Sequence, residues 1–289
     1  MALSREIKSK ITSIKKIEKI TKAMQSVAAS KMYRAKQRMM VSMPYALKLH
    51  KVVQHIATNN RGEEHACLEE RKQPSKVGYI VISTDRGLCG GLNLNLFEAV
   101  LTHARVFQQQ QIGTAWCLFG KKEGKFFSRI GMEVVAQVDG LGDSPAAERV
   151  MGAIKIMLDS YKAAGLDRLF LAHNEFINTL SQRPVVQQLL PLARVESNNR
   201  GIRDYLFEPL GQDREILDAV ITRHIETQAY QSLVANLACE QVARMMAMQQ
   251  AAENAKEYIK ELQMIYNKVR QELITSELSE ILGGVDTSF

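Results

Sequence analysis

The C-terminal part of this sequence contains a long stretch without a helix breaker. Between Gly211 and Gly283, 71 consecutive residues include neither glycine nor proline, so nothing there interrupts an α-helix. The apolar side chains recur every three or four positions and therefore fall on one stripe of such a helix. They are Ala238, Val242, Met245, Ala252, Ala255, Ile259, Leu262, Tyr266, Val269 and Leu273. A helix over the whole stretch would be roughly 100 Å long. Since that length exceeds the diameter of a small domain, we expect it to pack against another long element.

The N-terminal part offers a matching helix. Residues 4–58 carry a second apolar stripe, and their first proline is Pro44, where we expect a kink or a break. The stripe consists of Ile7, Ile11, Ile14, Ile17, Ile20, Met24, Ala28, Met32, Ala35 and Met39. Together the two helices predict an antiparallel two-helix coiled coil formed by both ends of the chain. The alternative is that each stretch is divided into shorter helices of an ordinary bundle.

The middle of the chain has a different pattern. Between about residues 76 and 205, short apolar runs such as VGYIVIS and DRLFLAHNEFI alternate with helical stretches. This alternation indicates a small α/β domain with a mainly parallel sheet. We therefore expect an α/β fold in which a central Rossmann-like domain is inserted into a long antiparallel coiled coil of the N- and C-terminal helices. The expected segments are 1–60 for the first helix, 61–210 for the central domain and 211–289 for the last helix.

A glycine-rich turn follows the first apolar run of the middle segment. In STDRGLCGGLN, residues 83–93, three glycines lie within five residues, as in many phosphate-binding loops. The lysine and hydroxyl of a GxxxxGK[ST] loop are absent, and the GxxGG spacing differs from the GxGxxG fingerprint of dinucleotide sites. A structural turn between a strand and a helix explains these glycines better than a nucleotide site does.

Other catalytic and metal-binding patterns are also absent from the sequence. The six histidines show no HExxH spacing, and His50 and His55 are expected at the surface. The four cysteines lie far apart, which favours reduced thiols over a zinc site or a disulfide framework. Asp139 and Asp143 belong to the sequence DGLGD, where turn chemistry explains both. We therefore expect no catalytic residue, no bound cofactor and no metal site.

Charge is distributed unevenly along the chain. The net charge is +7, but residues 1–60 hold thirteen lysines and arginines and two glutamates, a net of +11, and the rest sums to −4. A basic segment of this kind favours a negatively charged partner, and the candidates are nucleic acid, an anionic membrane surface and an acidic protein. No apolar run is long enough to span a membrane, and MALSREIKSK does not read as a secretory signal.

Four blocks of the sequence are distinctive together: KITKAMQSVAASKM (19–32), STDRGLCGGLN (83–93), CEQVARMMAMQQAAENA (239–255) and LQMIYNKVRQELITSELSEILGG (262–284). These blocks resemble the gamma subunit of the F-type ATP synthase, in its bacterial form. The resemblance covers essentially the whole chain. The sequence departs from the family pattern in three places: Val285 replaces an alanine, Cys239 stands where serine is usual, and Lys16-Ile17 replaces an Asn-Thr pair.

The resemblance implies the central rotor shaft of the enzyme. In this family the coiled coil stands inside a ring of three alpha and three beta subunits, and the central domain rests on the membrane c-ring beside epsilon. Ion flow turns the shaft, and each rotor angle favours a different conformation of the beta sites, which carry the nucleotides and the catalysis. The chain is then a non-catalytic subunit, present once per complex. It would meet the membrane only through the complex, on the cytoplasmic face of the bacterial inner membrane.

The resemblance also implies roles for individual residues. Those expected to contact the alpha/beta ring are Met24, Arg244, Arg270, Gln271, Thr275 and Glu277. Arg270 and Gln271 resemble a latch to a loop of beta, and Met24 and Arg244 resemble a facing pair near the lever of beta. A basic face toward the acidic segment of that lever is formed by Lys15, Lys16, Lys19 and Lys22, and the basic run continues to Lys31 and Arg34. Tyr205 and Glu208 resemble contacts to the c-ring and epsilon.

A nucleic-acid-binding coiled coil is a competing hypothesis, because the first helix is basic. Against it, that segment offers only Tyr33 and Tyr45 for stacking on bases, and the central segment has no RNP-like aromatic motif. A generic coiled-coil scaffold is a third possibility, but it would not need a central insert of about 130 residues. We therefore expect protein subunits, and no nucleic acid, as partners.

Overall fold

The structure is a computed structural model that describes residues 2–59, 66–71, 74–143, 145, 147–179, 181–192 and 213–286. Its elements are α1 (Ala2–Asn59), β1 (Lys76–Ile82), α2 (Leu92–Gln109), β2 (Gly113–Phe119), α3 (Lys121–Arg129), β3 (Val134–Val138), α4 (Ala147–Lys162), β4 (Arg168–Phe176), β5 (Gln182–Leu190) and α5 (Asp213–Asp286). The chain divides into two compact units: Met1–Ala29 with Arg244–Phe289, and Ser30–Ala243. Because this division cuts through both long helices, the three consecutive segments expected from the sequence stay a prediction.

Both terminal segments are single long helices, as predicted for the C-terminal one, whereas a kink or break was expected in the N-terminal one. α1 contains 58 residues and α5 contains 74. The break expected at Pro44 does not occur, since Pro44 lies inside α1. Proline removes one helical hydrogen bond, but contacts with α5 hold α1 on both sides of it. Ser42 Oγ lies 2.5 Å from Gln231 Oε1, and the rings of His50 and His224 stack with their centroids 5.3 Å apart. Tertiary packing thus outweighs the local effect of the proline.

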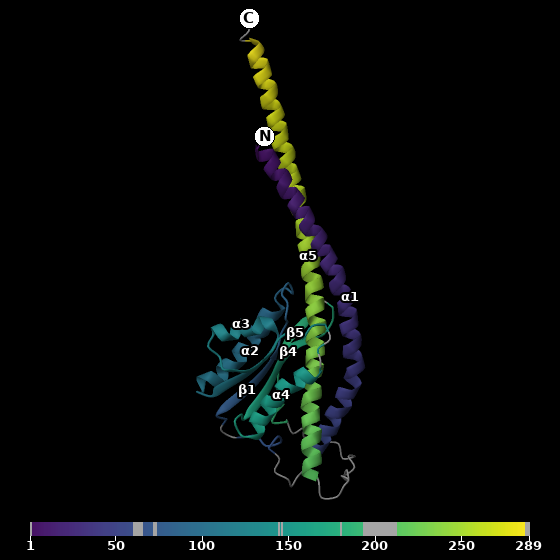
Figure 1. Ribbon diagram of the computed structural model, residues 1–289, viewed down its shortest axis with the longest axis vertical. Coiled ribbons are helices and arrows are strands. Elements are labelled where there is room, and N and C mark those ends of the chain that lie inside the picture. The colour runs from purple at the N-terminus through teal and green to yellow at the C-terminus, as the bar shows by residue number, and fades with distance from the viewer. Residues whose placement is uncertain are drawn as a thin grey trace. The chain divides into compact units, whose positions relative to one another are not determined.

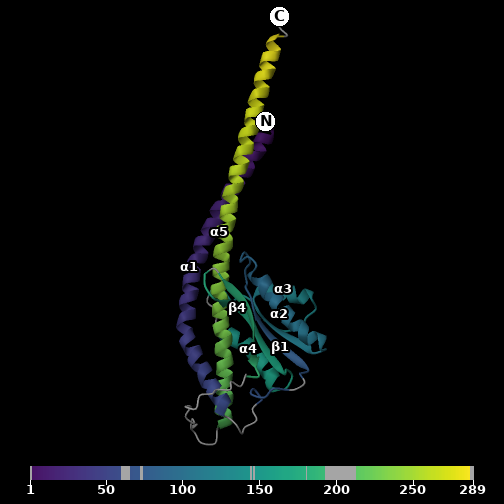
Figure 2. The same cartoon turned by 180° about the vertical axis from the view of Figure 1, so that it is seen from behind.

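In the first unit, the beginning of α1 lies beside the stretch of α5 that includes residues 259–269, the two run in opposite directions, and α5 continues past the start of α1 (Figures 1 and 2). An apolar cluster joins them, made by Ile7, Ile11, Ile14, Ile259, Leu262, Tyr266 and Val269. This pairing confirms the antiparallel coiled coil, and the cluster lies on the stripe predicted for α5.

The stripe predicted for α1 is wrong at two positions. Ile17 and Ile20 are 52% and 58% exposed, and Thr21 is buried in their place. The positions that do face α5 include residues 7, 14, 21 and 28, which are seven apart. A seven-residue repeat keeps a seam facing its partner in a left-handed coiled coil, whereas a step of 3.6 drifts away from it. The isoleucines at 17 and 20 fit the average helical period but not this seam.

The second unit contains a five-stranded sheet in the order β3-β2-β1-β4-β5. β1 is parallel to β2 and β4, and β2 is parallel to β3, so the predicted mainly parallel sheet is confirmed. β5 is antiparallel to β4 at one edge and was not expected from the sequence. It contains Pro184 and three glutamines, a composition that a central strand would not tolerate but an edge strand does.

Helices cover both faces of this sheet (Figure 1). α2 and α3 cover one face, over a core around Tyr79, Trp116 and Phe127. α4 and the first part of α5 cover the other face. The α5 members of that second core are Leu217, Ile221, Ile225, Ala229 and Leu233. α5 therefore completes the core of the α/β domain before it enters the coiled coil. None of the helices in the described part of the chain combines the length and the apolar character needed to cross a membrane.

Candidate functional site

The glycine-rich turn leads from the carboxyl end of β1 into α2, as predicted. Gly91 occupies the position that caps α2, and Gly90 has a φ of 58°, in the left-handed region that favours glycine. Leu88 also lies in that region, with a φ of 64°, although the conformation costs a residue with a side chain roughly 1–2 kcal/mol. The conformation of this leucine was not predicted, and its side chain is exposed at the tip of the turn.

The strand order reverses between β1 and β4, and doubly wound folds bind their ligands in the crevice at the carboxyl ends of such strands. Here Asn236 of α5 fills that position. Its amide group donates to the Ser83 carbonyl oxygen at 2.9 Å. Its oxygen accepts from Nδ2 of Asn174 at 2.9 Å and from the Asn174 main-chain N–H at 3.3 Å. All three residues are buried. A helix of the same chain thus occupies the place of a ligand, which supports the structural interpretation of the glycine-rich turn.

Cys239 lies about one turn further along α5 and packs at the same place. It forms a small apolar cluster with Cys89 and Leu92, and its thiol donates a weak hydrogen bond to the Asn174 carbonyl oxygen at 3.4 Å. Burial raises the pKa of Cys239 to about 12, so the thiol stays neutral. No disulfide joins the four cysteines, all of which the structure describes and buries. The cysteine that replaces the usual serine therefore acts as a small packing group.

Asp85 of the same turn ties together the ends of three strands. Its carboxylate accepts main-chain N–H groups from Lys121 at 3.3 Å, just after β2, and from Gly140 at 3.0 Å and Gly142 at 3.3 Å, just after β3. Hydrogen bonds to a charged acceptor are stronger than neutral ones. The STDRG sequence therefore positions the loop at residues 139–143.

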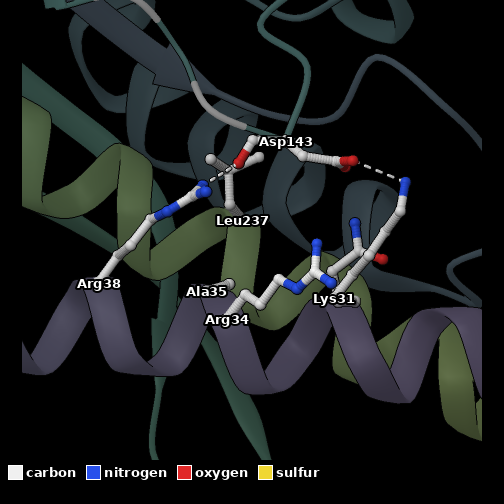
Figure 3. A pocket seen from close by; sticks show the side chains of 7 residues that line it. Lys31, Arg34, Ala35, Arg38, Asp143 and Leu237 are labelled. Atoms are coloured by element: carbon white, nitrogen blue, oxygen red, sulfur yellow. Dashed lines mark hydrogen bonds and ion pairs between the residues drawn. The ribbon is translucent and has the colours of Figure 1, made fainter.

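That loop in turn holds α1 (Figure 3). The carboxylate of Asp143 forms an ion pair with Lys31 Nζ at 2.7 Å, and its main-chain carbonyl oxygen accepts a hydrogen bond from Arg38. Lys31 belongs to the basic run that the family resemblance directs to the lever of beta, and here it has a partner within the chain. Because the pair is solvent-exposed, it contributes only about 0–1 kcal/mol. The loop and α1 are therefore joined by a contact that can be broken and remade.

Two histidines pack between α1 and α5. His224 is 1% exposed and stacks on His50. Nε2 of His224 and Nδ1 of His50 are buried without a hydrogen-bond partner in the described part of the chain. Burial, and then the charge of His50, lower the pKa of His224 to about 4, and burial lowers the pKa of His173 to about 4. The expected surface position is wrong for His50, and the side chain of His55 lies outside the described ones.

Four of the residues expected to contact the ring lie near the end of α5 in the first unit. They are Arg270 and Gln271, which resemble the latch, with Thr275 and Glu277, and all four are exposed. Val269 and Leu273, which belong to the packing stripe, are half-buried beside them. The Thr275 hydroxyl donates to the main-chain carbonyl oxygen of Gln271 at 2.9 Å, within the helix. The four side chains are accessible to another protein.

The predicted basic face is present on α1, with Lys15, Lys16, Lys19 and Lys22 all exposed. Lys22 forms an ion pair with Glu18 at 2.9 Å. The exposed Ile20 is four positions from Lys16 and lies beside it, whereas the exposed Ile17 points to another side of the helix. A partner that covers the basic face would have to offer carboxylates, with apolar surface only beside Lys16.

Two further pairs of residues are assigned to contacts with other subunits. Met24 is half-buried, and Arg244 is 9% exposed in the same unit. Burial alone does not show that the two side chains face each other, and their pairing stays a prediction. Tyr205 and Glu208 lie outside the described residues.

Sequence reasoning missed three residues that organise the second unit. Asp85 lies in a motif that was noticed for its glycines, Asp143 was explained as turn chemistry, and Asn236 lies unremarked on a long helix. Their partners are 36 to 153 positions away, and no local pattern indicates contacts of that span. Among the described residues, no group of three or more metal-ligand side chains comes together.

Comparison with known sequences gives full-length matches. A family model described as ATP synthase matches residues 4–287. The chain is 48% identical over 288 residues to the ATP synthase gamma chain of Nitrosococcus oceani, covering 98% of this chain and 99% of that one. It is 46% identical over 285 residues to the ATP synthase gamma chain of Coxiella burnetii, with 98% of both chains covered.

Solved structures with a similar fold come from more distant sequences. The rotor of the Euglena gracilis mitochondrial ATP synthase, in rotational state 1, matches with a TM-score of 0.67 at 18% identity, covering 94% of this chain and 99% of that one. A structure of the OSCP/F1/c-ring part of the same enzyme, in rotational state 3, matches with a TM-score of 0.71 at 18% identity, covering 99% and 94%. At this identity the likeness concerns the fold alone.

Proposed function

Because the chain belongs to the gamma-chain family of the ATP synthase, which it matches over 98% of its length, we propose that it is the central rotor subunit of such an enzyme. The observation that supports this role is the antiparallel pairing of the beginning of α1 with the end of α5. A paired helix resists twisting and bending better than a single one, and its exposed side chains differ from one side to the next. Each rotor angle would therefore present different contacts to a surrounding ring, which is how rotation biases ring conformations.

The chain would couple ion flow to ATP synthesis or hydrolysis without carrying out the chemistry. The buried Asn236 at the β1 and β4 crevice supports this, because it occupies the place where a nucleotide would bind in a related fold. We therefore assign the catalytic nucleotides to the beta subunits. The chain itself would need no cofactor and no metal.

The partners in this proposal are three alpha subunits, three beta subunits, epsilon and the c-ring, with one copy of this chain per complex. Arg270, Gln271, Thr275 and Glu277 would contact the ring through their exposed polar groups, since arginine and glutamine offer several donors to carboxylates. Met24 and Arg244 would form the pair near the lever of beta. Tyr205 and Glu208 would contact the c-ring and epsilon.

Lys15, Lys16, Lys19 and Lys22 would face the acidic segment of that lever.

The complex as a whole is membrane-associated. We place the chain peripherally, on the cytoplasmic face of the bacterial inner membrane.

Single-molecule rotation tests the proposal. The native thiols are buried, and burial raises the pKa of Cys67 to about 11 and that of Cys239 to about 12, so they react poorly at neutral pH. Val106→Cys, at an exposed position on α2, therefore gives one reactive site for a gold rod. With the alpha and beta subunits of the same organism assembled and immobilised, the rod should turn when ATP is added. It should stop when a non-hydrolysable analogue replaces ATP.

Hydrolysis by the assembled complex without rotation of the rod would contradict the proposal. The competing nucleic-acid hypothesis is tested with the same preparation. It predicts salt-dependent retention of the chain on immobilised DNA, and the rotor proposal predicts none after assembly.

A further inference from the structure

A small cavity in the second unit opens between α1, α5 and the loop at residues 139–143 (Figure 3). Its lining consists of Lys31, Arg34, Ala35, Arg38, Asp143, Leu237 and Gln241. Lys31, Arg34 and Arg38 are three and four positions apart on α1, so their side chains leave the helix on one side. Ala35 and Leu237, both buried, provide apolar surface beneath them.

The charges in this cavity do not balance. Three cations line it, and Asp143 is its single carboxylate. That carboxylate pairs with Lys31, while Arg38 binds the main-chain carbonyl oxygen of Asp143, which carries no net charge. Arg34 forms no ion pair or hydrogen bond with the residues that the structure describes. Among the lining residues, the charges of Arg34 and Arg38 are therefore not matched by a carboxylate.

The later part of α1 does not supply a second negative charge. α1 contains no aspartate or glutamate from residue 19 to its end at Asn59. Like charges one turn apart on a helix repel one another, so three cations on one side of α1 favour a bound anion. Arginine is suited to this role because its planar fork donates two parallel hydrogen bonds to an oxyanion.

We propose that this cavity binds a small tetrahedral oxyanion of the phosphate type, held by Arg34 and Arg38 between α1 and α5. The anion would complete the contact that the exposed Lys31–Asp143 pair makes only weakly. It would thereby fasten α1 to the α/β domain.

The size of the cavity favours a free ion over a nucleotide. Its volume is about 70 Å³. One water molecule needs roughly 10–15 Å³, so the space suits about five to seven groups of that size, and phosphate has five non-hydrogen atoms. Whole nucleotides and drug-sized ligands occupy pockets of roughly 300–1,000 Å³. A nucleotide could offer only its terminal phosphate, with the rest in solvent.

Equilibrium binding of radiolabelled inorganic phosphate to the full-length chain, at constant ionic strength, tests the proposal. We expect saturable binding that sulfate displaces and chloride does not. Arg34→Ala should weaken it at least about tenfold, the value of one lost charge-assisted hydrogen bond. Arg34→Lys keeps the charge and loses the planar guanidinium group, so its phosphate affinity should lie between those of wild type and Arg34→Ala. Lys48→Ala removes one exposed cation from α1 outside the cavity and should leave binding unchanged.

A second variant distinguishes a binding site from a general effect on folding. Asp143→Asn removes the one carboxylate among the described lining residues, which would compete with the anion, so it should strengthen phosphate binding while Arg34→Ala weakens it. Circular dichroism of each variant should show unchanged helix content. Equal phosphate binding by wild type and Arg34→Ala, or weaker binding by Asp143→Asn, would overturn the proposal. Tighter displacement by ATP than by phosphate would overturn the assignment to the free ion.

Discussion

At the scale of single residues, the second unit depends on a few buried polar side chains. Asn236 makes three hydrogen bonds across the carboxyl ends of β1 and β4, and His173 and His224 are buried with unpartnered ring nitrogens among the described residues. Removing the hydrogen-bond partner of a buried polar group, or giving the group a charge, destabilises the folded state. Substitutions and pH should therefore reveal their contribution directly.

Asn236→Ala should destabilise the second unit by about 3 kcal/mol, because the Ser83 carbonyl oxygen and the Asn174 amide groups would stay buried without partners. Urea unfolding followed by Trp116 fluorescence measures this, since Trp116 is the single tryptophan and is buried in the sheet. Gln263→Ala, at an exposed position of α5, is the matched control and should change little. A midpoint for Asn236→Ala equal to that of the control would show that the crevice needs no polar bridge.

Acid should weaken the same unit through its buried histidines. The folded-state pKa of His224 and that of His173 are both about 4, below the value of 6.5 for an unperturbed histidine. Between about pH 4 and 6.5 the unfolded chain therefore binds more protons than the folded chain. The stability that the two neutral histidines contribute is fully present above about pH 6.5 and is lost as the pH falls toward 4. At pH 5 each histidine should lower the free energy of unfolding by about 2 kcal/mol relative to its value at pH 7.

His224→Gln isolates one of these two contributions, because glutamine keeps a polar side chain but does not titrate. The loss of unfolding free energy between pH 7 and pH 5 should be clearly smaller in this variant than in wild type. An equal loss in both proteins would mean that His224 does not bind a proton on unfolding.

At the scale of elements, local pattern and long-range packing contribute differently. The two long helices and four of the strands follow from apolar periodicity and from the absence of breakers, so the sequence alone was sufficient to predict them. β5 was missed because Pro184 and its glutamines weaken the strand pattern, and only pairing with β4 makes it a strand. The unbroken α1 at Pro44 and the exposed Ile17 and Ile20 have the same origin. In each case the outcome depends on α5, which lies far away in the sequence.

The loop at residues 139–143 shows how one element positions another. Asp85→Ala would remove the acceptor for three main-chain N–H groups, so the loop should open and Asp143 should lose its hold on Lys31. Hydrogen exchange measured by mass spectrometry should be about tenfold faster in peptides that cover the loop and residues 30–42 of α1. Glu98→Ala, at an exposed carboxylate on α2, should leave both peptides unchanged. Faster exchange in the loop peptide alone would show that the loop does not stabilise α1.

At the scale of the whole molecule, function depends on contacts that the chain makes with other subunits. The family blocks in the sequence were sufficient to identify those partners as a hypothesis. Which residues meet them stays a prediction, because exposure on a helix shows only that a side chain is accessible. Arg270 and Gln271 beside the half-buried Val269 and Leu273 illustrate this limit.

A paired comparison in the assembled complex tests the assignment. Arg270→Ala with Gln271→Ala should lower ATP turnover about tenfold or more, since contacts worth about 1–3 kcal/mol would be lost at some rotor angles and not at others. Helix content should not change, because both residues lie off the packing stripe. Lowering the salt concentration should not restore turnover in this variant. Weaker screening strengthens long-range attraction between charges, but it does not replace lost short-range hydrogen bonds.

Lys15→Ala with Lys16→Ala serves as the matched variant on α1. It should give a smaller defect that varies with ionic strength, because exposed charges act over a Debye length of about 10 Å. If the lysine pair proved more important than the Arg270 and Gln271 pair, attraction of the basic face would be the main coupling contact.

The side chain of Asn236 in the β1 and β4 crevice has a consequence for what this domain can become. In effect α5 is an internal ligand, and covalent connection gives it a local concentration on the order of millimolar or more. Dilution cannot remove such a ligand, and a nucleotide in solution would have to displace a helix that also belongs to the hydrophobic core. This crevice thus keeps the shape of a binding site while a helix of its own chain fills it.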